Sequence, residues 1–120
     1  MTSFDADSLG ILRDIPEVAI RTGKHPQAAV VIWLVVAEDR VFVRSARGAK
    51  GRWYRDIATG GAATLEFSGR RIAVTAVPVS DAGSIDAASA EYRRKYRSSP
   101  YAPSVARPEV LATTLRLQPA

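Results

Sequence analysis

The stretch ATLEFSGRRIAVTAVPV, residues 63–79, decides the fold because it predicts two antiparallel strands joined by a tight turn. Apolar and polar residues alternate over 63–67, which is the period of a strand with one buried face. Ser68-Gly69 has the composition of a turn, and a second strand is predicted over residues 71–79. Beside Pro78 the apolar residues of this strand change phase, as they do at a bulge or a bent edge. Such bends are common where a sheet curls, so the stretch predicts a small barrel-like sheet.

Four further strands are predicted on either side of this hairpin. They cover residues 17–22, 28–37, 41–46 and 113–118. Residues 28–37 are dense in Val, Ile and Trp, and the run is too short and too β-branched to favour a helix. We expect this run to be one strand, buried on both faces for much of its length. The prediction is therefore six strands.

Two or three helices are expected around the sheet. An N-terminal helical segment is predicted within residues 1–16, capped by Asp7 or Ser8. A short helix is predicted over 52–59, and the longest over 81–98, followed by an irregular cover that extends to residue 108. The chain has no repeat and no interior linker, so we expect residues 1–120 to form a single domain.

Composition excludes much of common enzyme chemistry. The 120 residues include no cysteine and one histidine, so thiolate nucleophiles, disulfides and multi-histidine metal sites are ruled out, and no metal is expected. The longest apolar run, 28–37, is about half of what a membrane span needs, and the N-terminus lacks the pattern of a secretory signal. We therefore expect a cytoplasmic protein without a membrane partner.

The charge is unevenly placed, and its placement points to a binding segment. The chain has 17 Lys and Arg and 12 Asp and Glu, a formal net charge of +5. Residues 40–55 contain six basic side chains and no carboxylate. Within them SARGAKG, residues 45–51, joins the end of a strand to the start of a helix. Glycines, a helix start and nearby cations suit a phosphate group, although the spacing is not that of a Walker loop. The alternative is a solvated basic loop.

Several parts of the chain resemble the split-barrel flavin and deazaflavin-dependent nitroreductase-like proteins. The segments that carry this resemblance are Val43–Gly48, Gly51–Ile57, Arg21–Lys24, Val31–Val36 and Leu65–Val74. An uncharacterised bacterial branch of unknown function is closer still, on Gly51–Tyr54, on Tyr92–Tyr96 and on Pro108–Leu117. The resemblance covers residues 17–118. It implies a mainly β (α+β) fold, a six-stranded antiparallel split β-barrel with two or three flanking helices.

The same resemblance implies a cofactor and the residues that would hold it. The cofactor would be FMN or a deazaflavin coenzyme, bound between the two chains of a homodimer, and the protein would belong with small-molecule oxidoreductases. The implied cofactor-binding residues are Lys24, Ser45, Arg47, Gly48, Lys50, Gly51, Arg52, Trp53 and Tyr54. The family lysine is replaced by Arg47 and its second glycine by Ala49. No catalytic residue can be assigned.

Other conspicuous residues receive a structural interpretation. His25 lies in a Pro-flanked turn without an obvious partner in sequence, so we expect an exposed turn histidine. Trp33 lies within an apolar strand and is expected in the core. Trp53 is expected first to anchor its helix to the sheet, with stacking on a flavin as the alternative. Tyr92 and Tyr96 are four residues apart and share one helix face, which favours core or dimer packing.

Three hypotheses of function remain after these observations. The first is a flavin or deazaflavin-binding protein, with reduction of small molecules as the activity that the resemblance implies. The second is a non-catalytic dimeric scaffold of the same fold. The third and least favoured is nucleic-acid binding through residues 40–55, because stacking and phosphate contacts suffice for single strands. Fold alone does not choose among them.

Overall fold

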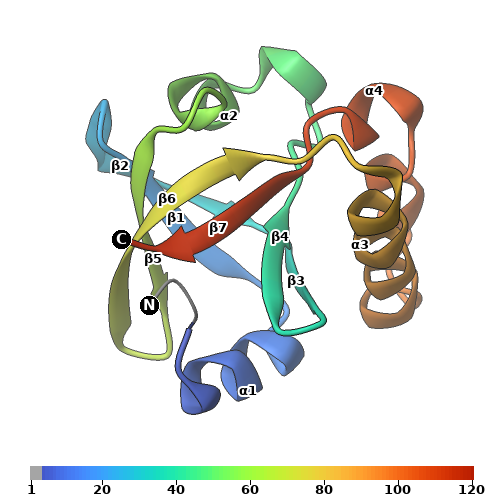
Figure 1. Cartoon of the computed structure of the whole chain (residues 1–120), viewed down its shortest axis with the longest axis horizontal. Coiled ribbons are helices and arrows are strands. Elements are labelled where there is room, and N and C mark those ends of the chain that lie inside the picture. Colours follow the sequence, from blue (N-terminus) through green and yellow to red (C-terminus); the bar gives the residue numbers. More distant parts are fainter. Residues whose placement is uncertain (1–3) are drawn as a thin grey trace.

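The computed structural model describes residues 4–120. Seven antiparallel strands form one strongly curved sheet, a half-barrel, in the order β2-β1-β5-β6-β7-β4-β3 (Figure 1). The strands are β1 (Val18–Thr22), β2 (His25–Ile32), β3 (Leu34–Ala37), β4 (Arg40–Val43), β5 (Ala62–Phe67), β6 (Arg70–Pro78) and β7 (Leu115–Pro119). The two strands that are consecutive in sequence, β2 and β3, therefore lie at opposite edges of the sheet.

The predicted strand over 28–37 is in fact two strands, which is why the sheet has seven strands rather than six. The break falls at Trp33, between β2 and β3. On one side β2 pairs with β1, and on the other β3 pairs with β4, so the chain must change partner between them. The prediction that this run is buried on both faces is confirmed for β3 only, because β2 is largely exposed.

The predicted hairpin at 63–79 is confirmed. Residues 62–67 of β5 pair in continuous register with residues 70–75 of β6, around a turn in which Ser68 and Gly69 have positive φ. The pairings of β6 with β5 and with β7 are both regular, without a bulge. The prediction of a bulge or bent edge beside Pro78 was therefore wrong. The strand ends at Pro78, and Val79 packs against a second apolar cluster.

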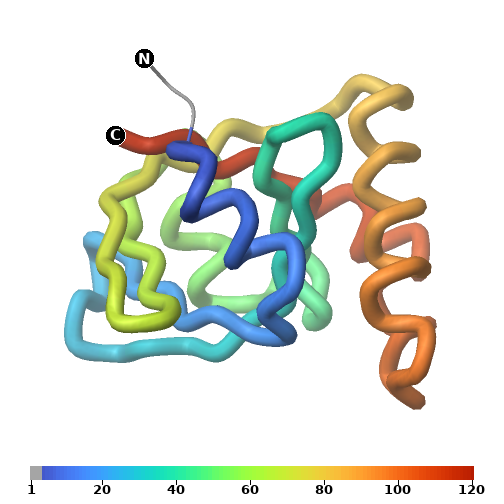
Figure 2. Tube along the Cα trace, turned by 90° about the horizontal axis from the view of Figure 1, so that it is seen from below, coloured from blue at the N-terminus to red at the C-terminus, as the bar shows by residue number. Residues whose placement is uncertain are grey.

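Four α-helices within residues 4–120 lie around the half-barrel, rather than the two or three expected, because α4 falls within the stretch predicted to be irregular or unassigned. They are α1 (Ala6–Asp14), α2 (Arg52–Ile57), α3 (Ala82–Lys95) and α4 (Pro108–Leu111), and two 3-10 turns are η1 (Gly48–Lys50) and η2 (Ala102–Val105). The cap of α1 is Asp5, which accepts a hydrogen bond from the backbone of Ser8, so the predicted caps Asp7 and Ser8 were wrong. Figures 1 and 2 show α1 and α2 at opposite ends of the half-barrel and α3 along one side. No helix within residues 4–120 is both long and apolar enough to cross a membrane.

Two apolar clusters hold these parts together. The larger one fills the half-barrel and includes Leu34, Val36 and Trp53. The smaller one lies between the outer side of β3 and β4 and helix α3, where Val35 meets Tyr92 and Tyr96. Alternate residues of β3 thus serve different clusters. Each large side chain buried in this way stabilises the fold by about 1.5–3 kcal/mol.

Candidate functional site

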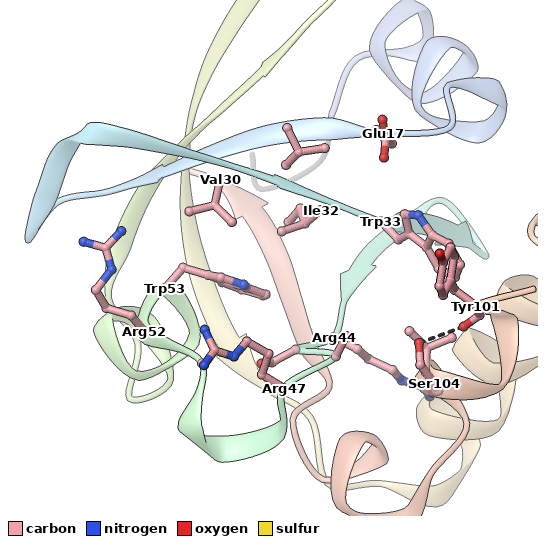
Figure 3. A pocket seen from close by; sticks show the side chains of 15 residues that line it. Glu17, Val30, Ile32, Trp33, Arg44, Arg47, Arg52, Trp53, Tyr101 and Ser104 are labelled. Atoms are coloured by element: carbon pink, nitrogen blue, oxygen red, sulfur yellow. Dashed lines mark hydrogen bonds between the residues drawn. The ribbon is translucent and has the colours of Figure 1, made fainter.

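A pocket of about 600 Å³ opens between β2 and the segment that follows β4. It is lined by Glu17, Val30, Val31, Ile32, Trp33, Arg44, Ser45, Ala46, Arg47, Gly51, Arg52, Trp53, Tyr101, Ser104 and Val105. In Figure 3, β2 forms the roof and the loop after β4 forms the floor. Pockets of about 300–1,000 Å³ are typical of small-molecule and cofactor sites.

The floor is a loop with a buried, hydrogen-bonded base, while Ala46, Arg47, Ala49 and Lys50 in it are exposed. The Ser45 hydroxyl is buried and donates to the Gly48 carbonyl at 2.8 Å, and the Ser45 amide donates to Thr113 Oγ1 at 2.9 Å. Gly48 has a φ of +67°, a conformation that favours glycine. A Cβ at Gly51 would lie only 2.5 Å from Ser45 Oγ, so this position has no room for a side chain. These contacts fix the loop beneath the pocket.

One side of the pocket is cationic. Arg47 and Arg52 are exposed and line it from the loop and from the first turn of α2. Neither of them forms an ion pair within residues 4–120. The arginines that do are Arg13, Arg21, Arg70, Arg71, Arg94 and Arg107. The one carboxylate of the lining, Glu17, lies near Trp33 at the far end in Figure 3. Arg47 and Arg52 are therefore available to an anionic ligand.

The opposite wall is apolar and aromatic. Val30 and Ile32 point from β2 toward the ring of Trp53 (Figure 3). Trp53 is 9% exposed, so it both anchors α2 in the core and presents part of its ring to the pocket. Trp33 is only partly buried and stacks on Tyr96, with ring centroids 4.0 Å apart and planes within 5°. The expected core packing of Trp33 is confirmed in part, because its ring packs against the smaller apolar cluster. Trp33 lies between β2 and β3 rather than within a strand, because the chain passes there from one sheet edge to the other. Both tryptophans of the chain thus line this pocket.

The structure brings five of the nine predicted cofactor residues to the pocket. Those five are Ser45, Arg47, Gly51, Arg52 and Trp53. The other four are Lys24, in the turn between β1 and β2, Gly48 and Lys50, in η1, and Tyr54, against the core. Lys50 and Lys24 are exposed but do not line the pocket. The predicted loop thus lies at the pocket, although not every cation in it reaches the lining.

Sequence reasoning missed the roof and one end of the pocket. The roof is the edge strand β2, where Val31 is 62% exposed. Its Val-rich and Ile-rich sequence predicted a buried strand, so the sequence held no signal for this wall. One end of the pocket is lined by Ser104, in η2, and by Tyr101, directly before η2. Both lie within the stretch that was expected to be an irregular cover. Nothing in the local sequence marks these two residues as pocket residues.

His25 has an acidic partner after all. Its Nδ1 lies 2.6 Å from an oxygen of Asp56, 31 residues away in sequence. The same oxygen accepts a hydrogen bond from Thr22 Oγ1 at 2.7 Å. That bond, followed by the interactions with His25, lowers the pKa of Asp56 from its ordinary value. The group ties the turn between β1 and β2 to α2 and lies outside the pocket lining.

The carboxylates of the described chain are spread out rather than gathered. No group of three or more His, Asp or Glu side chains among residues 4–120 is placed to hold a metal ion. Several carboxylates serve instead as helix caps, such as Asp5 for α1 and Asp81 for α3. The features that could bind a ligand are therefore the cationic side and the aromatic wall of the pocket.

Comparison with known proteins gives a family and a fold. The sequence profile described as "Uncharacterized protein conserved in bacteria (DUF2255)" matches residues 9–117. The conserved hypothetical protein Rv2991 from Mycobacterium tuberculosis superposes with a TM-score of 0.63 at 9% identity, over 100% of this chain and 81% of that one. The FAD and heme binding protein from Mycobacterium smegmatis superposes with a TM-score of 0.57 at 18% identity, over 99% and 67%. No curated protein matches the chain in sequence.

Proposed function

This chain belongs to the bacterial family DUF2255, and we propose that it binds a flavin or deazaflavin cofactor in the pocket beneath β2. The observation that carries the proposal is that the pocket offers two kinds of contact side by side. Arg47 and Arg52 are cationic, and Trp53, which lies between them in Figure 3, faces the apolar residues of β2. A flavin nucleotide has the matching parts, an anionic phosphate tail and a flat apolar ring.

Arg47 and Arg52 would hold the phosphate. Arginine binds phosphate through parallel N–H donors. Neither side chain forms an ion pair within residues 4–120, although the charge of Arg52 helps to lower the pKa of Asp56. The bond from buried Ser45 to the Gly48 carbonyl would keep the loop that carries Arg47 in place. The ring system would lie between Trp53 and the residues of β2, and it would supply redox chemistry that the protein side chains lack.

The fold is consistent with this proposal. The half-barrel is shared with the FAD and heme binding protein from M. smegmatis. The sequence segments also resemble the split-barrel nitroreductase-like proteins, in which two chains pair around the cofactor. We therefore propose in addition that the chain acts as a homodimer and reduces small molecules. In that arrangement a second chain would cover the exposed strand β2.

The first experiment is a titration of the purified chain with FMN, with FAD and with the deazaflavin coenzyme, followed by tryptophan fluorescence. Quenching is the appropriate readout because Trp33 and Trp53 both line the pocket. We expect saturable quenching by at least one of the three, with a Kd of about 1 μM or below, equivalent to a binding free energy of about −8 kcal/mol or stronger. No binding of any of them to folded protein would contradict the proposal and favour the scaffold hypothesis.

Charge-reversal variants locate the site. Arg47→Glu should weaken binding by about tenfold to a hundredfold, since hydrogen bonds to charged groups contribute about 1.5–3 kcal/mol. Arg55→Glu is the matched control, because Arg55 is exposed on the same short helix as Arg52 but does not line the pocket. Lys50→Glu should resemble the control for the same reason. Equal losses in all three variants would mean that only the general basic charge attracts the ligand.

A further inference from the structure

Arg44 is a buried arginine whose hydrogen-bond acceptors are all neutral groups. The residue is 4% exposed. Its Nε donates to Thr114 Oγ1 at 2.9 Å, and its Nη1 donates to the Val105 carbonyl at 3.1 Å. Its Nη2 donates to the Ile85 carbonyl at 3.0 Å and to Ser89 Oγ at 2.9 Å. Four hydrogen bonds therefore hold the guanidinium, and none of them comes from a carboxylate.

Among the described residues, this arrangement leaves one N–H donor of the Arg44 guanidinium without an acceptor and its positive charge without a carboxylate partner. A guanidinium has five N–H groups, so one hydrogen of Nη1 has no acceptor among residues 4–120. One face of the group is covered by the Tyr92 ring, whose centroid lies 5.1 Å from Arg44 Cζ. Burial, as the largest cause, lowers the pKa of Arg44, and the nearby charge of Arg93 lowers it further. Buried charges are normally paired, because removing them from water costs several kcal/mol.

A second cavity, of about 300 Å³, lies at this arginine. It is lined by Arg44, Ser89, Tyr92, Arg93, Arg97, Ala102, Pro103, Val105 and Ala106. Arg44 and Val105 also line the larger pocket, so they form part of a wall that the two share. The lining contains three arginines and no carboxylate. Its remaining surface consists mainly of small apolar side chains from η2 and its flanks, with the Tyr92 ring.

The other two arginines come from one face of α3 and the turn after it. Arg93 lies in the last turn of α3 and Arg97 in the turn that follows the helix, and both line the cavity. Both are exposed, and neither takes part in an ion pair within the described residues. The acid nearest in sequence, Glu91, instead pairs with Arg94 at 2.7 Å. The cavity is thus cationic both at buried Arg44 and at the exposed side chains of Arg93 and Arg97.

We propose that this cavity binds a small organic carboxylate, with the anionic group at Arg44, Arg93 and Arg97 and a compact apolar body against η2. The volume is half that of the larger pocket, which favours a compact ligand. Inorganic phosphate would match the charges but would leave the apolar wall in contact with water. A carboxylate on an apolar body satisfies both, and it would compensate the buried charge. The cavity shares only Arg44 and Val105 with the larger pocket, so carboxylate binding can be tested in the absence of a flavin.

The test uses benzoate as the probe, with benzamide as the uncharged body and acetate as the anion without a body. Binding is measured by calorimetry and by shifts of the backbone amides in two-dimensional NMR spectra. We expect saturable benzoate binding with shifts at Ser89, Ala102 and Ala106, and at least tenfold weaker binding of benzamide and acetate. Tryptophan fluorescence should stay unchanged, because both tryptophans line the other pocket.

Variants separate the site from general surface charge. The double variant Arg93→Gln/Arg97→Gln should weaken benzoate binding by about fivefold or more, since both side chains are exposed and each charged hydrogen bond from them contributes modestly. Arg94→Gln is the matched control on the same helix, outside the cavity. Arg44→Lys should also weaken binding if it folds, and the surface variants keep the test valid if it does not. Equal affinity for benzamide, equal losses in Arg94→Gln, or amide shifts confined to the larger pocket would overturn the proposal.

Discussion

Replacing Gly51 with alanine should destabilise the protein through one atom, the hydroxyl oxygen of Ser45. Gly51 has φ −60° and ψ 130°, a conformation that alanine adopts freely, so backbone strain is not the cause. The obstacle is space, because a Cβ built on Gly51 lies 2.5 Å from Ser45 Oγ. The next nearest atoms, the Gly48 carbonyl oxygen and Ser45 Cβ, are each at 3.6 Å, an ordinary contact. The conflict is thus confined to the hydroxyl.

The cost follows from what the hydroxyl must give up. To clear the new methyl group, Ser45 must rotate and lose its 2.8 Å bond to the Gly48 carbonyl. Ser45 is 1% exposed, so the displaced hydroxyl stays buried without this partner, at a cost of about 1–3 kcal/mol. The alternative, a shift of the loop, costs about 1–3 kcal/mol as well. Alanine in place of glycine lowers the entropy of the unfolded chain, which offsets about 0.4–1 kcal/mol. The net expectation is a decrease in the free energy of unfolding of about 1–2 kcal/mol.

A double-mutant cycle with Ser45→Ala isolates this conflict. Ser45→Ala removes one hydrogen bond and should cost about 1 kcal/mol. With the hydroxyl gone, the nearest remaining contacts to a Cβ at position 51 are the two at 3.6 Å, so Gly51→Ala should then be close to neutral. The two substitutions should therefore be non-additive by about 1–2 kcal/mol, within the range that contacting residues show.

Urea unfolding followed by tryptophan fluorescence measures the cycle, because Trp53 lies in α2 directly after the loop. Gly10→Ala is the matched control, since a Cβ at Gly10 in α1 meets nothing within 4 Å. That variant should be stabilised by up to about 1 kcal/mol. If Gly51→Ala destabilised the Ser45→Ala protein as much as the wild type, the assignment of the conflict to Ser45 would be refuted.

Two further predictions concern the contact between α3 and β3. Tyr96→Phe should lower the free energy of unfolding by about 1–3 kcal/mol, because the Tyr96 hydroxyl donates to the Pro16 carbonyl at 2.7 Å and accepts from the Leu34 amide at 3.2 Å. A calorimetric Tm equal to that of the wild type would contradict it. Burial lowers the pKa of Lys95 to about 8 in the folded protein, against about 10.4 in the unfolded chain. Between these two pH values the unfolded chain binds one proton more than the folded protein, so the free energy of unfolding should rise with pH. The expected rise is about 2 kcal/mol, which allows for the partial exposure of Lys95. Lys95→Met should lose this rise between about pH 8 and 10.4 in urea unfolding, and an unchanged pH profile would show that Lys95 does not titrate there.

The candidate site was only partly predictable, for a reason visible in its residues. Local composition suited residues 45–51, which include Arg47 and Gly51, to a phosphate group, with a solvated basic loop as the alternative. Arg52 and Trp53, which follow directly, were implied only by the family resemblance. Within the segment, sequence could not separate Arg47, which lines the pocket, from Lys50, which does not. Which way a loop side chain points depends on the contacts of the whole loop, here the Ser45 bond and the packing of η1 on α4.

The sequence by itself determined the elements whose cause is local. The alternation over 63–67, the Ser68-Gly69 turn and the apolar stripe of α3 each follow from spacing within a few residues, and the structure confirms all three. The absence of cysteine and the position of the basic segment are equally direct.

Tertiary structure alone decided what depends on partners far away in sequence. The strand over 28–37 breaks at Trp33 because its two halves pair with different strands at opposite edges of the sheet. His25 meets Asp56 because α2 packs on β1, and Arg44 meets Thr114, 70 residues away, because β4 pairs with β7. These contacts form only when distant strands pair and the helices pack on the sheet, so no window of the sequence contains the information that places them.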